Sequence, residues 1–378
     1  SIAAYHFYRS IYRAKKVLLL YDSRTAGHRS GEESRFIKQL KYHYNLPVKD
    51  QVCTYSVKPS IAEQKIIEKD DEVMAQLRSV FIENRKKFSA TSLNCYLDCP
   101  LKFYYNYVLG LAKADEVSET IEADSFGKIF HGTMEELYSD YIGKLVKRED
   151  LIAMSESTER LDDIITRQAV KVLRLGNAAP SGKLLIELGM IRTLVEMTLD
   201  FDFRRAPFVY VASELEMKMP FSVEPEEGEK FTVWLKGFID RVDFEEYSDT
   251  LRIIDYKTGH SSVCKIEEEE ETLDNMFDPK KKERAATTLQ MMLYAFMLAS
   301  IHPDIVEERD FELMVYSMKD IFSNVPASHL CEKEFLIAFR RRLSQLIEEI
   351  FNSDFPFAPN PGDGKKCQWC DFRTLCGN

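Results

Sequence analysis

The sequence predicts a mixed α/β fold, in which helices flank a central sheet of about four or five strands. Three successive stretches, 207–223, 231–245 and 251–257, alternate apolar and polar residues with the period of two that strands have. On both sides of them the apolar residues recur at helical spacing instead, over 122–141, 148–175, 181–204, 285–301 and 332–352. Another strand is expected at 311–317.

The helices that precede the first strand predict a helical insertion at about 142–205, because leucine and isoleucine recur there as in packed helices. Before the insertion, Ser92 is expected to cap an aromatic helical stretch. After the strands, the acidic run 267–271 is expected to lie in a solvated loop.

The composition is that of a globular protein. The chain has 378 residues, of which 45% are hydrophobic and 30% charged, enough for two or three domains. No apolar run reaches the ~18 residues that a membrane span needs, so we expect a soluble, cytoplasmic protein. The net charge of −11 argues against a protein that coats nucleic acid non-specifically. It is compatible with a nuclease, in which only a local groove need be basic.

Residues 1–88 are expected to form a segment of their own. A basic helix end at Arg13–Lys16 leads into a short apolar strand, Val17–Tyr21. A polar helix at about 62–84 then ends at the basic Arg85–Lys87, where we place the boundary to the main domain, 89–378.

The sharpest chemical signal lies at the ends of two neighbouring strands. Asp255 and Lys257 fall on one face of the third strand, and strand pairing can bring Asp240 of the second beside them. Carboxylate oxygens suit Mg²⁺ or Mn²⁺, and a lysine near the metal can orient a water or neutralise developing charge. Taken alone, an Asp-x-Lys is most often a surface ion pair.

Further polar residues change that balance. Glu214 and Glu216 lie in the preceding strand, His131 lies on an upstream helix, and Gln290 and Tyr294 stand one helical turn apart. Singly, each has a simpler interpretation: His131 as a core histidine, Gln290 as a helix-surface residue.

Together, these residues resemble the RecB-type branch of the PD-(D/E)XK nuclease superfamily over residues 89–378. The pattern is, in order, His131, Glu214, Gly237-x-x-Asp240, Asp255-x-Lys257 and Gln290-x-x-x-Tyr294. The resemblance implies a PD-(D/E)XK, restriction-endonuclease-like core. No proline precedes Asp240 and the second acid is aspartate, both of which are usual in this branch.

The resemblance also implies a role for each residue. It makes His131, Asp240, Asp255 and the Tyr256 carbonyl the metal ligands, and Lys257 the catalytic amine. Gln290 and Tyr294 would support the site and contact DNA. Glu214 would be a supporting or second-metal carboxylate.

A cysteine cluster closes the chain. Cys367, Cys370 and Cys376 supply three thiolates within ten residues, and with no secretory segment a metal or iron–sulfur site is favoured over disulfides. Four thiolates close a zinc site or a cubane cluster, and the candidates for the fourth are Cys95 and Cys99.

The run from Cys99-Pro100 to Phe103–Tyr105 resembles the first ligand of the iron–sulfur nuclease domain of AddB-like proteins. The resemblance implies a [4Fe-4S] cluster held by Cys99 and the three C-terminal cysteines. Zn²⁺ in the same thiolates and three unligated cysteines are the alternatives. Cys53, Cys264 and Cys331 are expected to be ordinary buried or half-buried thiols.

The start of the chain carries another resemblance. Tyr8–Lys16 followed by Val17–Tyr21 is similar to the last motif of superfamily 1 DNA helicases, which implies that Arg13 senses nucleotide phosphate. A basic helix end that complements the helix dipole is the alternative. No Gly-x-x-x-x-Gly-Lys-Ser/Thr loop is present for ATP hydrolysis. We interpret 1–88 as a helicase remnant with its linker.

These patterns lead to one expected function and two rivals. We expect a Mg²⁺- or Mn²⁺-dependent deoxyribonuclease, acting as an exonuclease or endonuclease on single-stranded DNA. By resemblance it would belong to a bacterial helicase–nuclease in double-strand-break repair, with a helicase portion upstream in the same chain and an AddA-like subunit. The rivals are a non-catalytic DNA-binding or scaffold subunit and a free-standing nuclease of the CRISPR-adaptation kind.

Overall fold

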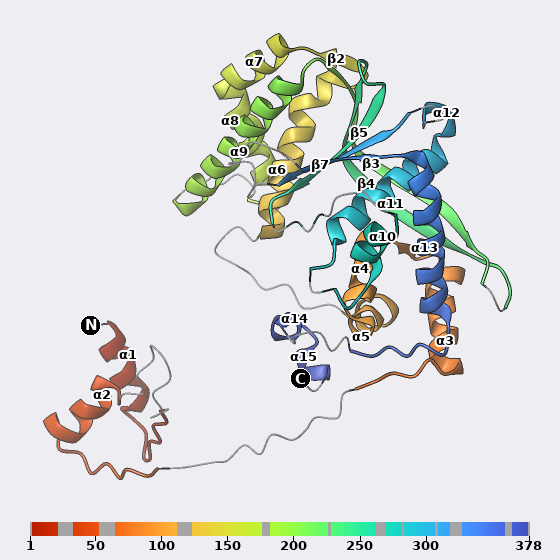
Figure 1. The fold of residues 1–378 in the computed structure, drawn as a ribbon. Helices are drawn as coiled ribbons and strands as arrows, with labels where there is room; N and C mark the ends of the chain where they lie inside the picture. Colours follow the sequence, from red (N-terminus) through yellow and green to blue (C-terminus); the bar gives the residue numbers. More distant parts are fainter. Residues whose placement is uncertain are drawn as a thin grey trace. The chain divides into compact units, whose positions relative to one another are not determined.

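The chain folds as two units, Ser1–Ile61 and Ala62–Asn378, in the computed structural model (Figure 1). The structure describes residues 2–21, 33–52, 65–111, 123–175, 182–225, 228–259, 261, 263, 269–281, 283–306, 309–317, 327–359 and 365–376.

The first unit is helical. Helix α1 (Ile2–Ile11) is followed by α2 (Arg35–Lys38), which continues as a π-helical turn at Gln39–His43. Phe7 of α1 stacks on Phe36 of α2 with ring centroids 5.0 Å apart. The strand predicted at Val17–Tyr21 is wrong, because this segment has no hydrogen-bonded partner strand among the described residues.

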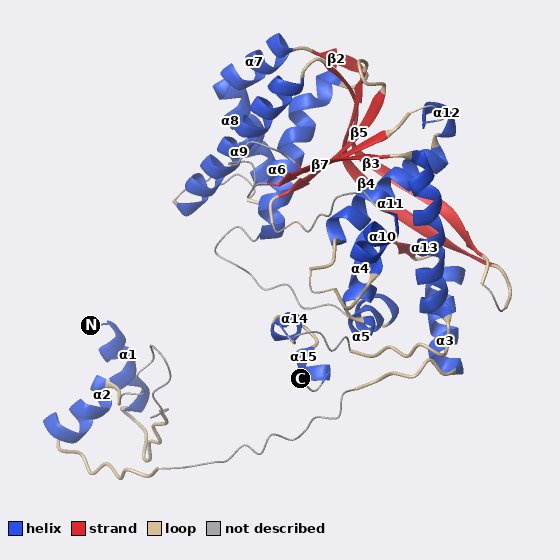
Figure 2. Ribbon diagram, in the orientation of Figure 1, coloured by secondary structure: helices blue, strands red, loops and turns tan. Residues whose placement is uncertain are grey.

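A seven-stranded mixed sheet forms the centre of the second unit (Figure 2). Its main path runs β2-β3-β4-β5-β6-β7, and β1 (Lys87–Phe88) pairs in parallel with β4. The other strands are β2 (Lys144–Val146), β3 (Phe208–Val223), β4 (Phe231–Glu245), β5 (Thr250–Lys257), β6 (Phe311–Ser317) and β7 (Ala327–Cys331). Only β5–β6 and β1–β4 are parallel among the described strand pairs. The predicted mixed α/β sheet is confirmed; β1, β2 and β7 are additional.

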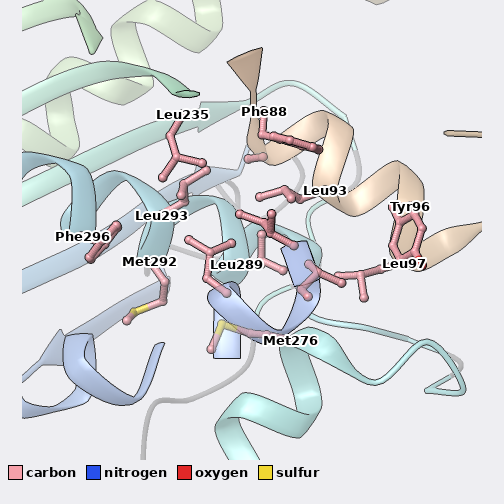
Figure 3. Close-up of a cluster of buried hydrophobic side chains, with 14 of the residues drawn as sticks. Phe88, Leu93, Tyr96, Leu97, Leu235, Met276, Leu289, Met292, Leu293 and Phe296 are labelled. Carbon is pink, nitrogen blue, oxygen red and sulfur yellow. The ribbon is translucent and has the colours of Figure 1, made fainter. Parts of the chain in front are cut away.

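Two groups of helices cover the two faces of this sheet (Figure 2). The predicted helical insertion packs on one face as α6 (Ala123–Tyr138), α7 (Arg148–Glu156), α8 (Thr158–Leu173) and α9 (Lys183–Arg205). The larger core lies on the other face, under α4 (Ala90–Asp98), α10 (Glu269–Phe277), α11 (Ala286–Ile301) and α13 (Lys333–Phe351). Figure 3 shows part of this core, where Phe88 and Leu235 meet Leu289 and Leu293.

The remaining helices are short. They are α3 (Asp71–Arg78) with a π-helical turn at Ser79–Glu83, α5 (Pro100–Phe103) with one at Tyr104–Val108, a 3-10 turn at Ser139–Tyr141, α12 (Pro303–Val306), α14 (Lys365–Gln368) and α15 (Arg373–Cys376). No helix in the described ranges has the length and hydropathy needed to cross a membrane.

Three local predictions need correction. The N-cap of α4 is Ser89, whose hydroxyl accepts from Ser92 N, while the Ser92 hydroxyl accepts from Ser89 N. Residues 269–271 begin α10 and do not lie in a loop, because acidic side chains stabilise a helix N-terminus. The helix predicted from residue 62 begins at Asp71, and it packs with the second unit through Leu77.

A buried charged cluster joins the insertion to the sheet. The Arg241 guanidinium on β4 donates to Asp243 Oδ1 and Oδ2 at 2.8 and 2.7 Å and to Asp202 Oδ2 of α9 at 2.6 Å. The hydroxyls of Tyr138 (α6) and Tyr316 (β6) donate to Asp202 at 2.6 and 2.9 Å. All three charged side chains are at most 2% exposed, so each one needs its partners.

We expect Arg241→Met to lower the free energy of unfolding by about 3–5 kcal/mol, because it leaves two buried carboxylates without a cation. Urea denaturation followed by circular dichroism measures the change. Arg204→Met is the matched control, since Arg204 on α9 is half exposed and pairs with Asp200 one turn away. Equal effects of the two substitutions would contradict the role given to the cluster.

Candidate active site

The site begins where β4 and β5 separate. Their antiparallel pairing runs from Glu245–Thr250 to Arg241–Ile254 and stops there. At the next position the side chain of Asp240 takes the place of a backbone acceptor, since Tyr256 N donates to Asp240 Oδ2 at 2.7 Å. The Asp240 carboxylate is therefore fixed between the two strands.

Glu214 on β3 lies opposite Asp240, at an irregular point of the sheet. Its φ of +45° is in the left-handed region, which non-glycine residues rarely adopt. Strict alternation would put Ile239 and Val242 on opposite faces, yet both belong to the same core. Glu214 faces His131 of α6 from this irregular point, and unusual backbone of this kind is typical of functional sites.

His131 of α6 completes a group of three possible metal ligands. Its Nδ1 lies 3.5 Å from Asp240 Oδ1 and 3.6 Å from Glu214 Oε1, and the donor atoms of the three residues all lie within 4.8 Å of one another. His131 Nε2 lies 3.1 Å from the Tyr256 carbonyl oxygen. When Nε2–H donates to that oxygen, the Nδ1 lone pair faces the carboxylates, which is how metal-binding histidines are oriented.

The charges of this group also fit a cation. Burial lowers the pKa of His131, but hydrogen bonds and charge from Asp240 and Glu214 outweigh it and raise the pKa to about 10. The carboxylates of Asp240 and Glu214 thus stabilise a positive charge placed between them. A divalent cation would supply that charge and displace the proton, because a histidine ligand must be neutral.

Lys257 lies on the α11 side of the opened strands. Its Nζ donates to Gln290 Oε1 at 2.9 Å and lies 2.9 Å from Asp255 Oδ2. The Gln290 amide donates to Asp255 Oδ1 at 3.0 Å and to the Tyr294 hydroxyl oxygen at 2.8 Å. One glutamine therefore fixes the lysine, the carboxylate and the tyrosine together.

Asp255 is the most buried acid of the site, with 1% of its surface exposed. Burial raises the pKa of its carboxyl to about 6, although the neighbouring Lys257 lowers it. Its Oδ2 is buried without a well-oriented hydrogen bond, although Lys257 Nζ is near. A buried oxygen in this state is suited to accept a cation or a water.

Gly237 allows Tyr294 to approach β4. A Cβ at this position would lie 3.1 Å from two ring carbons of Tyr294 and 3.3 Å from Met297 Sδ, closer than ordinary contacts. The glycine of the Gly237-x-x-Asp240 pattern thus has a steric reason, because a residue with a Cβ would push the Tyr294 ring away from β4 by a few tenths of an ångström.

The structure places the predicted residues in two adjoining sets. His131, Glu214 and Asp240 form the three-ligand group, while Asp255, Lys257, Gln290 and Tyr294 form the network beside it. Asp255 is outside the three-ligand group, and the Tyr256 carbonyl already contacts His131. Glu214, expected as a supporting or second-metal carboxylate, lies within the three-ligand group itself.

A cavity of ≈ 470 Å³ beside the three-ligand group was not predicted. Its lining includes His131, Glu214 and Thr258, together with Lys128 of α6 and Lys171 of α8. The sequence offered one signal, because Lys128 and His131 are three residues apart on one helix. The contribution of α8 depends on how the insertion folds back.

The three C-terminal cysteines lie near Cys99. Cys376 is buried; burial and the neighbouring Cys99, Cys370 and Cys367 raise the pKa of its thiol to about 11. Cys99 Sγ accepts from Lys102 N at 3.4 Å. No disulfide joins the described cysteines, and none of them belongs to the three-ligand group.

The other cysteines have simpler surroundings. Cys331 is fully buried beside Met292, as expected of an ordinary thiol. Cys95 is half buried, and burial raises the pKa of its thiol to about 11. Cys53 and Cys264 lie outside the described residues.

Acidic residues and a lysine at the opened strands of a mixed sheet are typical of nucleases that use divalent cations. Residues 87–377 match the PD-(D/E)XK nuclease superfamily, and the chain belongs to that superfamily.

Named relatives come from bacteria, and each is one subunit of an ATP-dependent helicase/deoxyribonuclease. The protein of Alkaliphilus metalliredigens is 26% identical over 188 residues, which are 47% of this chain and 16% of that protein. The protein of Symbiobacterium thermophilum is 27% identical over 201 residues, which are 50% of this chain and 17% of that protein. The protein of Carboxydothermus hydrogenoformans is 30% identical over 189 residues, which are 47% of this chain and 16% of that protein. The matches thus span about a sixth of these relatives.

Among solved structures, an exonuclease candidate of Eubacterium rectale aligns with 78% of this chain and 89% of its own, at 8% identity and a TM-score of 0.37.

The pKa of Asp255 predicts a pH dependence of stability in EDTA. In the folded chain the pKa is about 6 against an ordinary 3.8, so the folded state holds an extra proton between these values. Stability should therefore fall as pH rises from about 4 to about 6, and Asp255→Asn should remove this part of the fall. Urea titrations at several pH values measure it, and parallel curves for the two proteins would contradict it.

Proposed function

We propose that this chain is a divalent-cation-dependent deoxyribonuclease. The observation that carries the proposal is the three-ligand group of His131, Glu214 and Asp240, with Lys257 held in place beside it by Gln290. The chain's membership of the PD-(D/E)XK nuclease superfamily supports the same activity. Mg²⁺ or Mn²⁺ suits the two carboxylates, and one histidine nitrogen is compatible with either ion.

The residues of the site have separate tasks in hydrolysis of a phosphodiester. A divalent cation bound there would polarise the phosphate and offset charge that develops on its oxygens. His131, Glu214 and Asp240 would hold the cation, and Asp255 would add negative charge beside them. Lys257 donates hydrogen bonds toward the attacking water or the phosphate. Gln290 and Tyr294 are positioning residues, because they act through Lys257 and Asp255.

The substrate and partners follow from the named relatives. Because these are helicase/deoxyribonuclease subunits, we propose that the chain cuts single-stranded DNA produced by a helicase, in bacterial double-strand-break repair in the cytoplasm. Within the predicted segment 1–88, the first unit would be the end of a helicase portion, with Arg13 toward nucleotide phosphate, whereas α3 and β1 pack with the nuclease domain. An AddA-like subunit would be the partner. The short share of each relative that is matched supports a longer parent protein.

We further propose that Cys99, Cys367, Cys370 and Cys376 hold a [4Fe-4S] cluster. Cys99 and the two other C-terminal thiols all act on the pKa of Cys376, so the four lie near one another. This proximity favours Cys99 over Cys95 as the fourth ligand. The cluster would connect Cys99, near the start of the nuclease domain, to the cysteines near its end, and would restrict the long loop between them.

Cleavage of end-labelled single-stranded DNA tests the nuclease. We expect Mg²⁺- or Mn²⁺-dependent cutting that EDTA abolishes, and a loss of roughly 100-fold or more in Lys257→Ala and Asp240→Ala. Lys144→Ala on β2 is the matched control, because Lys144 is exposed and away from the site. A folded wild type that binds DNA without cutting it under any of these conditions would favour the non-catalytic subunit instead.

Metal analysis after anaerobic purification tests the cluster. We expect about four iron atoms per chain in the wild type and loss of the iron in Cys99→Ala. The melting temperature of Cys99→Ala should also fall, because the cluster no longer connects two segments that are distant in sequence. Cys95→Ala should keep its iron and serves as the matched control. Stoichiometric zinc in place of iron would overturn the cluster, and iron loss in Cys95→Ala alone would overturn the choice of ligand.

A further inference from the structure

One face of the outer half of β4 is not covered by the described helices. Val233 and Leu235 are fully buried against the larger core, on the side where Figure 3 shows Leu235 beside Phe88. The residues that alternate with them, Trp234, Lys236 and Phe238, are partly exposed. Large aromatic side chains are therefore held on an open sheet face, where they contribute little to the core.

Basic side chains accompany these aromatic rings. Lys87 of β1 pairs in register with Trp234, which puts both on the same face. The Arg85 guanidinium lies 5.8 Å from the centre of the Trp234 ring, and Lys236 Nζ lies 4.5 Å from the centre of the Phe238 ring. We call these five residues the basic–aromatic track.

The track leads to the active site. A cavity of ≈ 350 Å³ is lined by Lys87, Lys236, Phe238 and Tyr294, together with Ser89, Ala90, Thr91 and Gly237. Tyr294 belongs to the network of Gln290, Asp255 and Lys257. Phe238 precedes Asp240 by two residues, about 7 Å along a strand. A chain lying on the track would therefore reach the three-ligand group.

The charge of the track is positive although the net charge of the chain is −11. The acidic Glu216 faces Phe238 across the strands. The Glu216 carboxylate forms ion pairs with Lys218 Nζ at 2.7 Å and with Lys236 Nζ at 3.7 Å, so its negative charge is balanced. Arg85 and Lys87 add two further cations.

We propose that the basic–aromatic track binds single-stranded DNA and guides it to the active site, an inference that rests on the proposed nuclease function. Spaced cations contact backbone phosphates, and aromatic rings stack on bases whatever their sequence. Stacking of this kind needs unpaired bases, which is why the track selects single strands over duplex.

The chain has two tryptophans, Trp234 and Trp369, so fluorescence can report on the track directly. The full chain is used in EDTA, which prevents cleavage, and titrated with an oligothymidine. In Trp369→Phe, only Trp234 emits, and we expect quenching on binding. In Trp234→Ala, which removes the stacking ring, only Trp369 emits, and we expect no quenching and roughly 5- to 100-fold weaker binding by anisotropy. Quenching of Trp369 alone would overturn the track.

A double variant tests the charges. Lys87→Ala with Lys236→Ala should lower the slope of log affinity against log salt by about 1.4, from two lost phosphate contacts at ~0.7 each. Lys144→Ala with Lys183→Ala is the matched control, since both lysines are exposed and outside the track. An unchanged slope in the track variant, or equal affinity for a duplex of the same length, would overturn the proposal.

The two hypotheses fail in different ways. If the wild type binds single strands through the track and never cuts them, the track stands and the nuclease function fails. If the wild type cuts DNA and the track variants bind and cut as well as it does, the nuclease stands and the track fails.

Discussion

The separation of β4 from β5 is the constraint on which the site depends. Paired strands use their backbone groups on each other, and a carboxylate can enter between them only where that pairing stops. Asp240 does so by accepting the Tyr256 amide hydrogen, so the same contact links the two strands and fixes this carboxylate. The Tyr256 carbonyl then orients His131. Site geometry and sheet geometry are therefore one feature of this fold.

The buried charged cluster around Arg241 stabilises β4 and β5 next to the position where they separate. Arg241 adjoins Asp240 in sequence, and the Tyr256 hydroxyl, which Arg241 contacts at 3.3 Å, belongs to the residue between Asp255 and Lys257. Because Asp202 belongs to α9, the helical insertion helps to fix the backbone of both β4 and β5. The site itself concentrates negative charge, whereas the track beside it is positive. This arrangement is what the proposed function requires of an acidic chain, since only the approach to the proposed cation site needs to be basic.

Much of the fold could be predicted from periodicity. The strands at 208–223, 231–245 and 250–257 and most of the long helices appear close to their predicted bounds, because each is long enough to show its period. The single helix predicted over 148–175 is wrong, because the non-helical backbone at Ser157 divides it into α7 and α8. Short elements were missed or misplaced, as with β7 at Ala327–Cys331 and the start of α10 at Glu269. A strand of about five residues or fewer has no measurable period, and its existence depends on a neighbouring strand edge.

The sequence by itself determined the mixed α/β class and the residue types of the site, because strand alternation, helical spacing and the Asp255-x-Lys257 pattern are local properties of the chain. Tertiary structure alone decided which of these residues meet. It grouped Glu214 with His131 and Asp240 through a left-handed backbone turn, and it put Asp255 on the other side with Lys257 and Gln290. Such a division follows from strand separation and helix packing between segments distant in sequence, which no local pattern encodes.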